Sequence, residues 1–458
     1  MGPRGGVATL LGRLVRNARL RRVLLAFLLF SAAEFGTWVA ILLYAYERTG
    51  PLSVGLVALV QLVPAALLAP AAAALGDRFP RERVLAAGYA FQAAGMLATG
   101  LAMAADTPPL VTYALAAVTA SSLVVTRPTQ SALLPSLAVA PEDCTTANGA
   151  SGLIEGAGLL GGPLAAAAIL VVGTPADVFL VASGCLALAT VATIGLRSPV
   201  APIEFATDDG SDAGMLAGLR VILQDADARV LVGLMTVRML AIGCCDVLFV
   251  LLALESLGTG EPGAAILSAA LGAGSMLGGA ATFSIVGRAR LAAVAAVGAV
   301  AWGLGIAAIG LSQSALAAPL LVIGAGAGIA IVDIAGRTLL QRSVRDEVLA
   351  RVFGLQEGLA MAGLAIGSVI VPILVAVGGV VGCVFVVAAI PPLAVALQWR
   401  RLGDLERGTT VPAREIALLR RDFIFRPLPA PELEAVARRA QWVSIPGGAD
   451  LMREGDPG

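Results

Sequence analysis

Apolar stretches of about twenty residues recur along this chain from Val23 to about Arg400, separated by short segments rich in glycine, proline and charge. A helix needs about 20 residues to cross the hydrocarbon core of a bilayer, which is about 30 Å thick. The pattern therefore predicts twelve transmembrane helices, at about 23–46, 53–75, 84–104, 110–134, 147–172, 176–196, 230–254, 263–286, 291–311, 315–340, 350–376 and 380–400.

The composition excludes several classes of soluble protein. Of the 458 residues, 58% are hydrophobic and 14% are charged, whereas a soluble domain carries about 25% charged residues. Such a chain is not a water-soluble globule, a nucleic-acid binder or a disulfide scaffold. The 31 basic and 31 acidic residues balance, so no net charge favours nucleic acid as a partner. The predicted fold class is an all-α membrane protein of twelve transmembrane helices.

The sequence contains no histidine, and all of its basic residues are arginine. The absence of histidine excludes Ser-His-Asp catalysis, histidine-dependent metal sites and an imidazole proton relay. The five cysteines lack the spacing of metal ligands, and we interpret them as small apolar side chains within the spans. No nucleophile–base set or nucleotide-binding loop is evident either. We therefore predict no metal, no cofactor and no enzymatic activity, and proton chemistry falls mainly to carboxylates.

Arginines gather on alternate connections between the predicted spans. They occur in the N-terminal arm, in the second-to-third, eighth-to-ninth and tenth-to-eleventh connections, and at Arg400–Arg401, whereas the opposite connections contain only Arg48. The positive-inside rule then places both termini in the cytoplasm. We predict a multi-pass protein of a bacterial cytoplasmic membrane, with the lipid bilayer as its surroundings.

The chain contains an internal repeat. The segment Gly152-Leu-Ile-Glu-Gly156 of the fifth span reappears as Gly354-Leu-Gln-Glu-Gly358 in the eleventh, and Arg22-Val-Leu-Leu reappears as Arg229-Val-Leu-Val. Both offsets are near 202–210 residues, so six spans repeat in the same orientation, the arrangement of parallel halves around an axis along the membrane normal. The predicted domains are an arm (1–22), a first six-helix bundle (23–196), a linker (197–229), a second six-helix bundle (230–400) and a tail (401–458).

The connection after the second span carries a motif, Leu75-Gly-Asp-Arg-Phe-Pro-Arg-Glu-Arg-Val-Leu85. It resembles the loop signature of the major facilitator superfamily, whose members fold as two pseudo-symmetric six-helix bundles. The resemblance implies a charge network that latches the cytoplasmic gate, and it assigns that role to Asp77, Arg78 and Arg81. The alternative interpretation is a solvated charge run that anchors the loop.

The fifth span adds a second motif, in which Gly149, Gly158 and Gly162-Pro163 are spaced as in the antiporter signature of the same superfamily. Small residues let helices approach closely, and proline removes a backbone hydrogen bond. The resemblance implies a helix hinge or packing site typical of exporters. It covers roughly residues 20–400 and is nearest to bacterial drug and enterobactin exporters.

Ionisable residues inside spans are costly and are functional candidates by default. The candidates are Glu34, Arg127, Glu155, Arg238, Asp246, Asp333, Arg337 and Glu357. Equal distances from the connecting loops predict two ion pairs, Arg127–Glu155 and its repeat equivalent Arg337–Glu357. These pairs could brace the bundles or act as switches during transport.

Glu34 lies near the middle of the first span with no cation one turn away, and apolar surroundings favour the protonated form of a carboxylate. We predict that Glu34 couples transport to protons, with Asp246 as the second choice and Arg238 two turns before it. Trp38 and Phe35 are predicted to line an apolar cavity. The alternative is a protonated Glu34 that is hydrogen-bonded to backbone.

The tail, from Trp442 to the Arg453-Glu-Gly-Asp456 segment, is similar to the opening of a cyclic-nucleotide-binding domain. The remaining strands and the phosphate-binding cassette of such a domain are absent from the sequence. A cyclic nucleotide is therefore a possible partner only if a complete C-terminal domain exists.

Together these features predict a secondary active transporter, more narrowly a proton-coupled exporter of amphipathic or apolar small molecules that works by alternating access. The predicted partners are a small-molecule substrate and protons. A lipid or siderophore exporter is an alternative, and so is a non-transporting receptor that signals through the tail.

Overall fold

The computed structural model describes residues 17–137, 141–196, 225–283, 291–312, 314–343, 346–408 and 413–422, with a few single residues of the tail. These parts of the chain are helical, with short turns between the helices and no strand among them. Most of the tail lies outside the described residues, as does the greater part of the predicted linker.

The described residues of the first half form seven helices. They are α2 (Ala18–Thr49), α3 (Pro51–Arg78), α4 (Arg81–Ala104), α5 (Pro109–Leu123), α6 (Thr126–Leu137), α7 (Pro141–Leu170) and α8 (Pro175–Thr193). Local sequence signals set their starts. The Asn17 side chain accepts hydrogen bonds from the backbone N–H groups of Arg19 and Leu20 at the start of α2, and proline opens α5 and α8.

The second half follows the same plan. Its elements are α10 (Ala226–Leu251) with a π-helical end, η1 (Leu252–Ser256), then α11 (Gly260–Phe283), α12 (Leu291–Ser312), α13 (Ala317–Ser343) and α14 (Asp346–Gly408). The 63 residues of α14 are interrupted at Gly379, where φ is 68° and ψ is 175°. This left-handed backbone suits glycine and separates the two final spans that the sequence predicts. A short helix, α15 (Ala413–Leu419), follows in the tail.

Ten of the described helical stretches are long and apolar enough to cross a membrane. One of them, Leu355–Leu405, has 51 residues and contains the break at Gly379, so it is long enough for two crossings. The apolar part of α3, Pro51–Ala65, is shorter. The all-α membrane fold expected from hydropathy is therefore confirmed.

The fourth predicted span differs from the expectation of one continuous helix over 110–134. It is divided into α5 and α6 by a turn at Val124–Val125. Pro128 explains the division, because a proline has no N–H to donate to the carbonyl four residues earlier, here that of Val124, and its ring crowds that carbonyl. The break places Arg127 in the first turn of α6.

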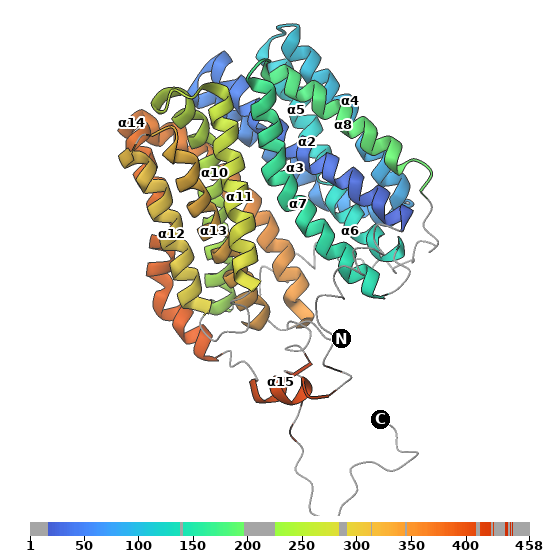
Figure 1. The fold of residues 1–458 in the computed structure, drawn as a ribbon, viewed down its shortest axis with the longest axis vertical. Helices are drawn as coiled ribbons and strands as arrows, with labels where there is room; N and C mark the ends of the chain where they lie inside the picture. Colours follow the sequence, from blue (N-terminus) through green and yellow to red (C-terminus); the bar gives the residue numbers. More distant parts are fainter. Residues whose placement is uncertain are drawn as a thin grey trace, which may run out of the picture.

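The helices form two groups that lie side by side, α2–α8 and α10–α14 (Figure 1). Glycines allow the two halves to touch closely at two crossings. A Cβ atom at Gly272 of α11 would lie 2.7 Å from the carbonyl oxygen of Leu159 in α7, and one at Gly55 of α3 would lie 2.5 Å from that of Ser368 in α14. Backbone contact of this kind is how small residues hold membrane helices together.

Successive spans alternate in direction, so two ends of the fold are distinguished. The turns at Gly50, Asp106, Gly173 and Gly258 lie at one end, called here the Gly50 end. The end of α8 and the start of α10, which flank the linker, lie at the other, called the linker end.

Candidate functional site

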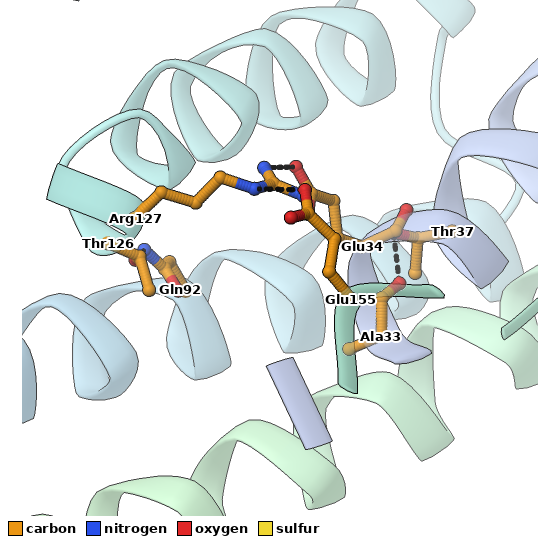
Figure 2. A network of polar contacts seen from close by, with 7 residues as sticks. All are labelled: Ala33, Glu34, Thr37, Gln92, Thr126, Arg127 and Glu155. Carbon is orange, nitrogen blue, oxygen red and sulfur yellow. Dashed lines mark hydrogen bonds and ion pairs between the residues drawn. The ribbon is translucent and has the colours of Figure 1, made fainter. Parts of the chain in front are cut away.

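Three charged side chains from three helices meet in the first half, and we call Glu34, Arg127 and Glu155 the acidic triad (Figure 2). The Arg127 guanidinium donates to both carboxylate oxygens of Glu34, each over 2.8 Å, and its Nε donates to Oε1 of Glu155 over 3.1 Å. Such a two-pronged arginine–carboxylate contact is among the strongest hydrogen-bonded geometries in proteins. One arginine thus joins α2, α6 and α7, and the triad carries a formal charge of −1.

The broken fourth span is what positions Arg127. The Gln92 side chain of α4 donates to the Ser122 carbonyl oxygen over 3.1 Å and to the Thr126 hydroxyl over 2.9 Å, which satisfies polar groups exposed by the break. The guanidinium also lies 5.7 Å from the centre of the Phe30 ring and 5.9 Å from that of Phe35. Aromatic faces at these distances attract a cation. Phe35 therefore contacts Arg127.

Glu34 has no cation one turn away on α2, as the sequence indicates, but a cation from another helix binds it. Its partner is 93 residues away in sequence and comes from a helix that is not joined to α2 by a loop. Only 20% of the Glu34 side chain is exposed. The predicted contact between Arg127 and Glu155 is present, but as one arm of a three-residue cluster.

A second cluster occupies the other half, and we call Arg238, Asp333 and Arg337 the basic triad. Asp333 of α13 lies 3.0 Å from the Arg238 guanidinium of α10 and 3.1 Å from Nε of Arg337, one turn further along α13. Here one aspartate joins two arginines, so the triad carries a formal charge of +1. Arg238 is buried, and its Nε has no hydrogen-bond partner among the described residues.

The predicted pair Arg337–Glu357 is not formed. Arg337 pairs with Asp333 instead, because side chains four residues apart on one helix lie next to each other. Glu357 is exposed on α14. The four-residue spacing of Asp333 and Arg337 is the sequence signal for this contact. The prediction from equal distances to the connecting loop did not use this spacing.

The two halves are also joined by a polar contact. The Trp38 indole of α2 donates to Oδ2 of Asp246 in α10 over 3.0 Å. Both residues are candidates from the sequence, but the sequence analysis predicted no contact between them. Arg238, two turns before Asp246 on α10, binds Asp333, and the indole of Trp38 is the group that holds the Asp246 carboxylate.

Further contacts between the halves lie at the Gly50 end. The Tyr46 hydroxyl donates to Glu255 of η1 over 2.8 Å. The carboxyl groups of Glu47 in α2 and Glu261 in α11 lie close to each other at the same end. The sequence interpretation did not select these residues, although the acidic side chains at the ends of two spans were a visible signal.

Comparison with known proteins now decides the family. The model of the Major Facilitator Superfamily matches residues 23–357. The chain belongs to the major facilitator superfamily. Membrane transport, and not enzymatic activity, is therefore the general function that its fold and family support.

Solved structures share the fold at low sequence identity. The nucleoside transporter NupG is 13% identical with a TM-score of 0.69, covering 85% of this chain and 99% of its own. A bacterial homologue of the human lysosomal transporter Spinster, in an inward-facing, unoccupied conformation, is 14% identical with a TM-score of 0.66, covering 85% and 98%. A POT family transporter in complex with a thioalcohol-conjugated peptide is 13% identical with a TM-score of 0.65, covering 84% and 96%. A search of curated protein sequences gave no match.

The glycine motif that resembles a superfamily signature lies on the face of α7 that packs against α2. A Cβ atom at Gly158 would lie 2.3 Å from Cβ of Ser31, and one at Gly162 would lie 2.6 Å from the Ala32 carbonyl oxygen. Pro163 follows inside α7. These contacts bring α7 close to α2 next to Glu34. A hinge motion stays a prediction, and the surroundings of Gly149 lie outside the described side chains.

The superfamily loop motif connects α3 to α4. Asp77 and Arg78 end α3, with side chains outside the described set, and Arg81 begins α4 after Pro80. Their role as a gate latch stays a prediction. Within the described residues, no group of three or more Cys, Asp or Glu side chains is arranged to hold a metal ion.

Proposed function

We propose that this protein is a proton-coupled exporter of amphipathic or apolar small molecules that works by alternating access of its two halves. The observation that carries the proposal is the Trp38–Asp246 hydrogen bond, which joins an intramembrane carboxylate of one half to the other half. An ionised carboxylate accepts a stronger hydrogen bond than a protonated one. Binding of a proton to Asp246 therefore weakens a contact that holds the halves together.

Asp246 replaces Glu34 as the leading candidate for the coupling carboxylate. Both oxygens of Glu34 are occupied by Arg127, whereas Asp246 makes no ion pair with any residue that the structure describes. Its Oδ2 is held by the neutral indole of Trp38. A carboxylate without a fixed counter-ion is better suited to load and release a proton. Glu34 instead binds Arg127 and has a proposed role as a member of the acidic triad.

The proposed direction of transport is export. Export is supported by the resemblance of Gly158, Gly162 and Pro163 to the antiporter signature, together with the close α7–α2 packing at the two glycines. The inner membrane of a bacterium, with both termini in the cytoplasm, is supported by the distribution of arginines.

The test is transport in proteoliposomes under an imposed pH gradient, with dyes, antibiotics, siderophores and lysolipids as candidate substrates. We expect Asp246→Asn to lose the dependence on the pH gradient but to retain exchange of substrate between the two sides. Asp227→Asn, which neutralises an exposed carboxylate in the first turn of α10, is the matched control and should retain the dependence. Retained dependence in Asp246→Asn would remove this residue from the mechanism. Absence of transport for every class of substrate would favour the receptor alternative.

A further inference from the structure

Two members of each triad lie in corresponding spans of the internal repeat, within about one helical turn of equivalent positions and with their charges exchanged. Arg238 follows Glu34 by 204 residues, and Asp333 follows Arg127 by 206 residues. In the first half an arginine is the shared partner of two carboxylates, and in the second half a carboxylate is the shared partner of two arginines. The three residues of the acidic triad carry a formal charge of −1 and those of the basic triad +1, and the exposed Glu357 of α14 lies within electrostatic reach of Arg238.

Both triads lie on the same side of the contact between the halves. Glu34 precedes Trp38 by one helical turn, and Arg238 precedes Asp246 by two, which corresponds to about 6 Å and about 12 Å along the helix axes. Trp38 and Asp246 touch each other across the halves. The acidic triad also reaches this boundary, because Gly156, next to Glu155, packs against Met276 of α11.

Each triad has one member that is open to a ligand. The Glu155 side chain is 47% exposed and that of Arg337 is 41% exposed. Charged groups within transmembrane helices face the bundle interior or water in preference to lipid. Arg238 adds an unpartnered Nε that is buried within the basic triad. An unsatisfied buried donor of this kind is an unusual feature in a protein interior and calls for an acceptor.

From this arrangement we propose that the triads form the two poles of one binding site, and that the site takes a zwitterionic molecule. Its cationic group lies at Glu155 and its anionic group lies at Arg337, the exposed carboxylate and the exposed guanidinium of the two triads. This inference rests on the transport function proposed above and narrows its substrate class. The shared chemistry is an ammonium and an anionic group on one molecule, either a free zwitterion or a lipid headgroup.

The probe is a set of amphiphiles that share a dodecyl chain and differ in headgroup charge. They are dodecylphosphocholine, dodecyltrimethylammonium, dodecyl sulfate and dodecyl maltoside, titrated calorimetrically into the full-length protein in nanodiscs, with empty nanodiscs subtracted. We expect the zwitterion to bind at least tenfold more tightly than either singly charged probe. Phosphocholine without the chain separates the two sources: similar affinity identifies a free zwitterion, and loss of binding identifies a lipid headgroup.

Two substitutions give opposite results if the poles are assigned correctly. Glu155→Gln should shift the preference towards dodecyl sulfate, and Arg337→Gln should shift it towards dodecyltrimethylammonium, each by about tenfold relative to the other probes. Glu155→Asp and Arg337→Lys keep the charges and should restore the original order, which separates loss of a pole from loss of folding. Asp227→Asn should leave the order unchanged.

Equal affinity for all headgroups, no binding by any probe, or the same shift in both Gln variants would overturn the proposal. Transport is measured separately with the preferred probe under a pH gradient. Selective binding without gradient-driven movement would contradict the proposed transport function and leave the zwitterion site standing. Gradient-driven movement without headgroup selectivity would support the proposed transport function and contradict the zwitterion site.

Discussion

Removal of Arg127 should destabilise the protein more than removal of either of its partners. Arg127→Gln strands two carboxylates, and one of them, Glu34, has a side chain that is only 20% exposed. Breaking a buried ion pair from one side costs about 3–5 kcal/mol, and the 36% exposure of the Arg127 side chain reduces this to roughly 2–3 kcal/mol. Glu34→Gln leaves Arg127 with Glu155 at 3.1 Å, so its cost should be smaller, about 1 kcal/mol.

The decisive variant is the double substitution Arg127→Gln with Glu34→Gln. It leaves no stranded charge at position 34, so it should be more stable than Arg127→Gln alone by about 1–2 kcal/mol, although it carries an extra substitution. The free energy of unfolding is measured by equilibrium denaturation in mixed micelles of dodecyl maltoside and SDS. If the double variant instead loses the sum of the two single losses to within about 0.5 kcal/mol, the two side chains do not interact and the triad is not an energetic unit.

Two further predictions follow from the same packing. Exchanging the charges, with Glu34→Arg and Arg127→Glu, should fail to restore stability until Glu155→Gln is added, because the new glutamate at position 127 would face Glu155. Thermal unfolding of the two-site and three-site variants tests this prediction. Full rescue of the melting temperature by the exchange alone would contradict it. Gly162→Val should lower the free energy of unfolding by about 2 kcal/mol or more, because its Cβ would lie 2.6 Å from the Ala32 carbonyl oxygen. Gly161→Val, whose Cβ would have no atom within 4 Å, should have little effect. Equal melting temperatures for the two variants would count against close α7–α2 packing.

The span pattern could be predicted because hydropathy is a local property of the sequence. Each helix satisfies its own backbone hydrogen bonds, so length and composition are sufficient to find it in a bilayer. The break between α5 and α6 was missed for the same reason, since the apolar run continues through it. Pro128 next to Arg127 was the available signal, and hydropathy gives a proline little weight.

The partners of the charges were harder to predict, because they depend on which helices touch. Loop distances compare only helices that are joined by a loop, so they found Arg127–Glu155 and missed Arg127–Glu34. The internal repeat held the missing information. Positions 34 and 238 lie in corresponding spans, and so do positions 127 and 333, so their opposite charges indicate a contact between the same two spans in both halves.

The exchange of charges between the triads also affects how the halves interact. Two identical triads of charge −1 would repel each other across the boundary, whereas triads of −1 and +1 attract. At an effective dielectric constant of 20, opposite unit charges separated by roughly 10–20 Å attract each other by on the order of 1 kcal/mol. This is large enough to bias the approach of the halves about fivefold and small enough for a bound molecule to overcome. A zwitterion that neutralises both triads removes this attraction. A cation or an anion alone neutralises one triad and leaves the other uncompensated. The same charges can therefore set both the selectivity for the bound molecule and the movement of the two halves.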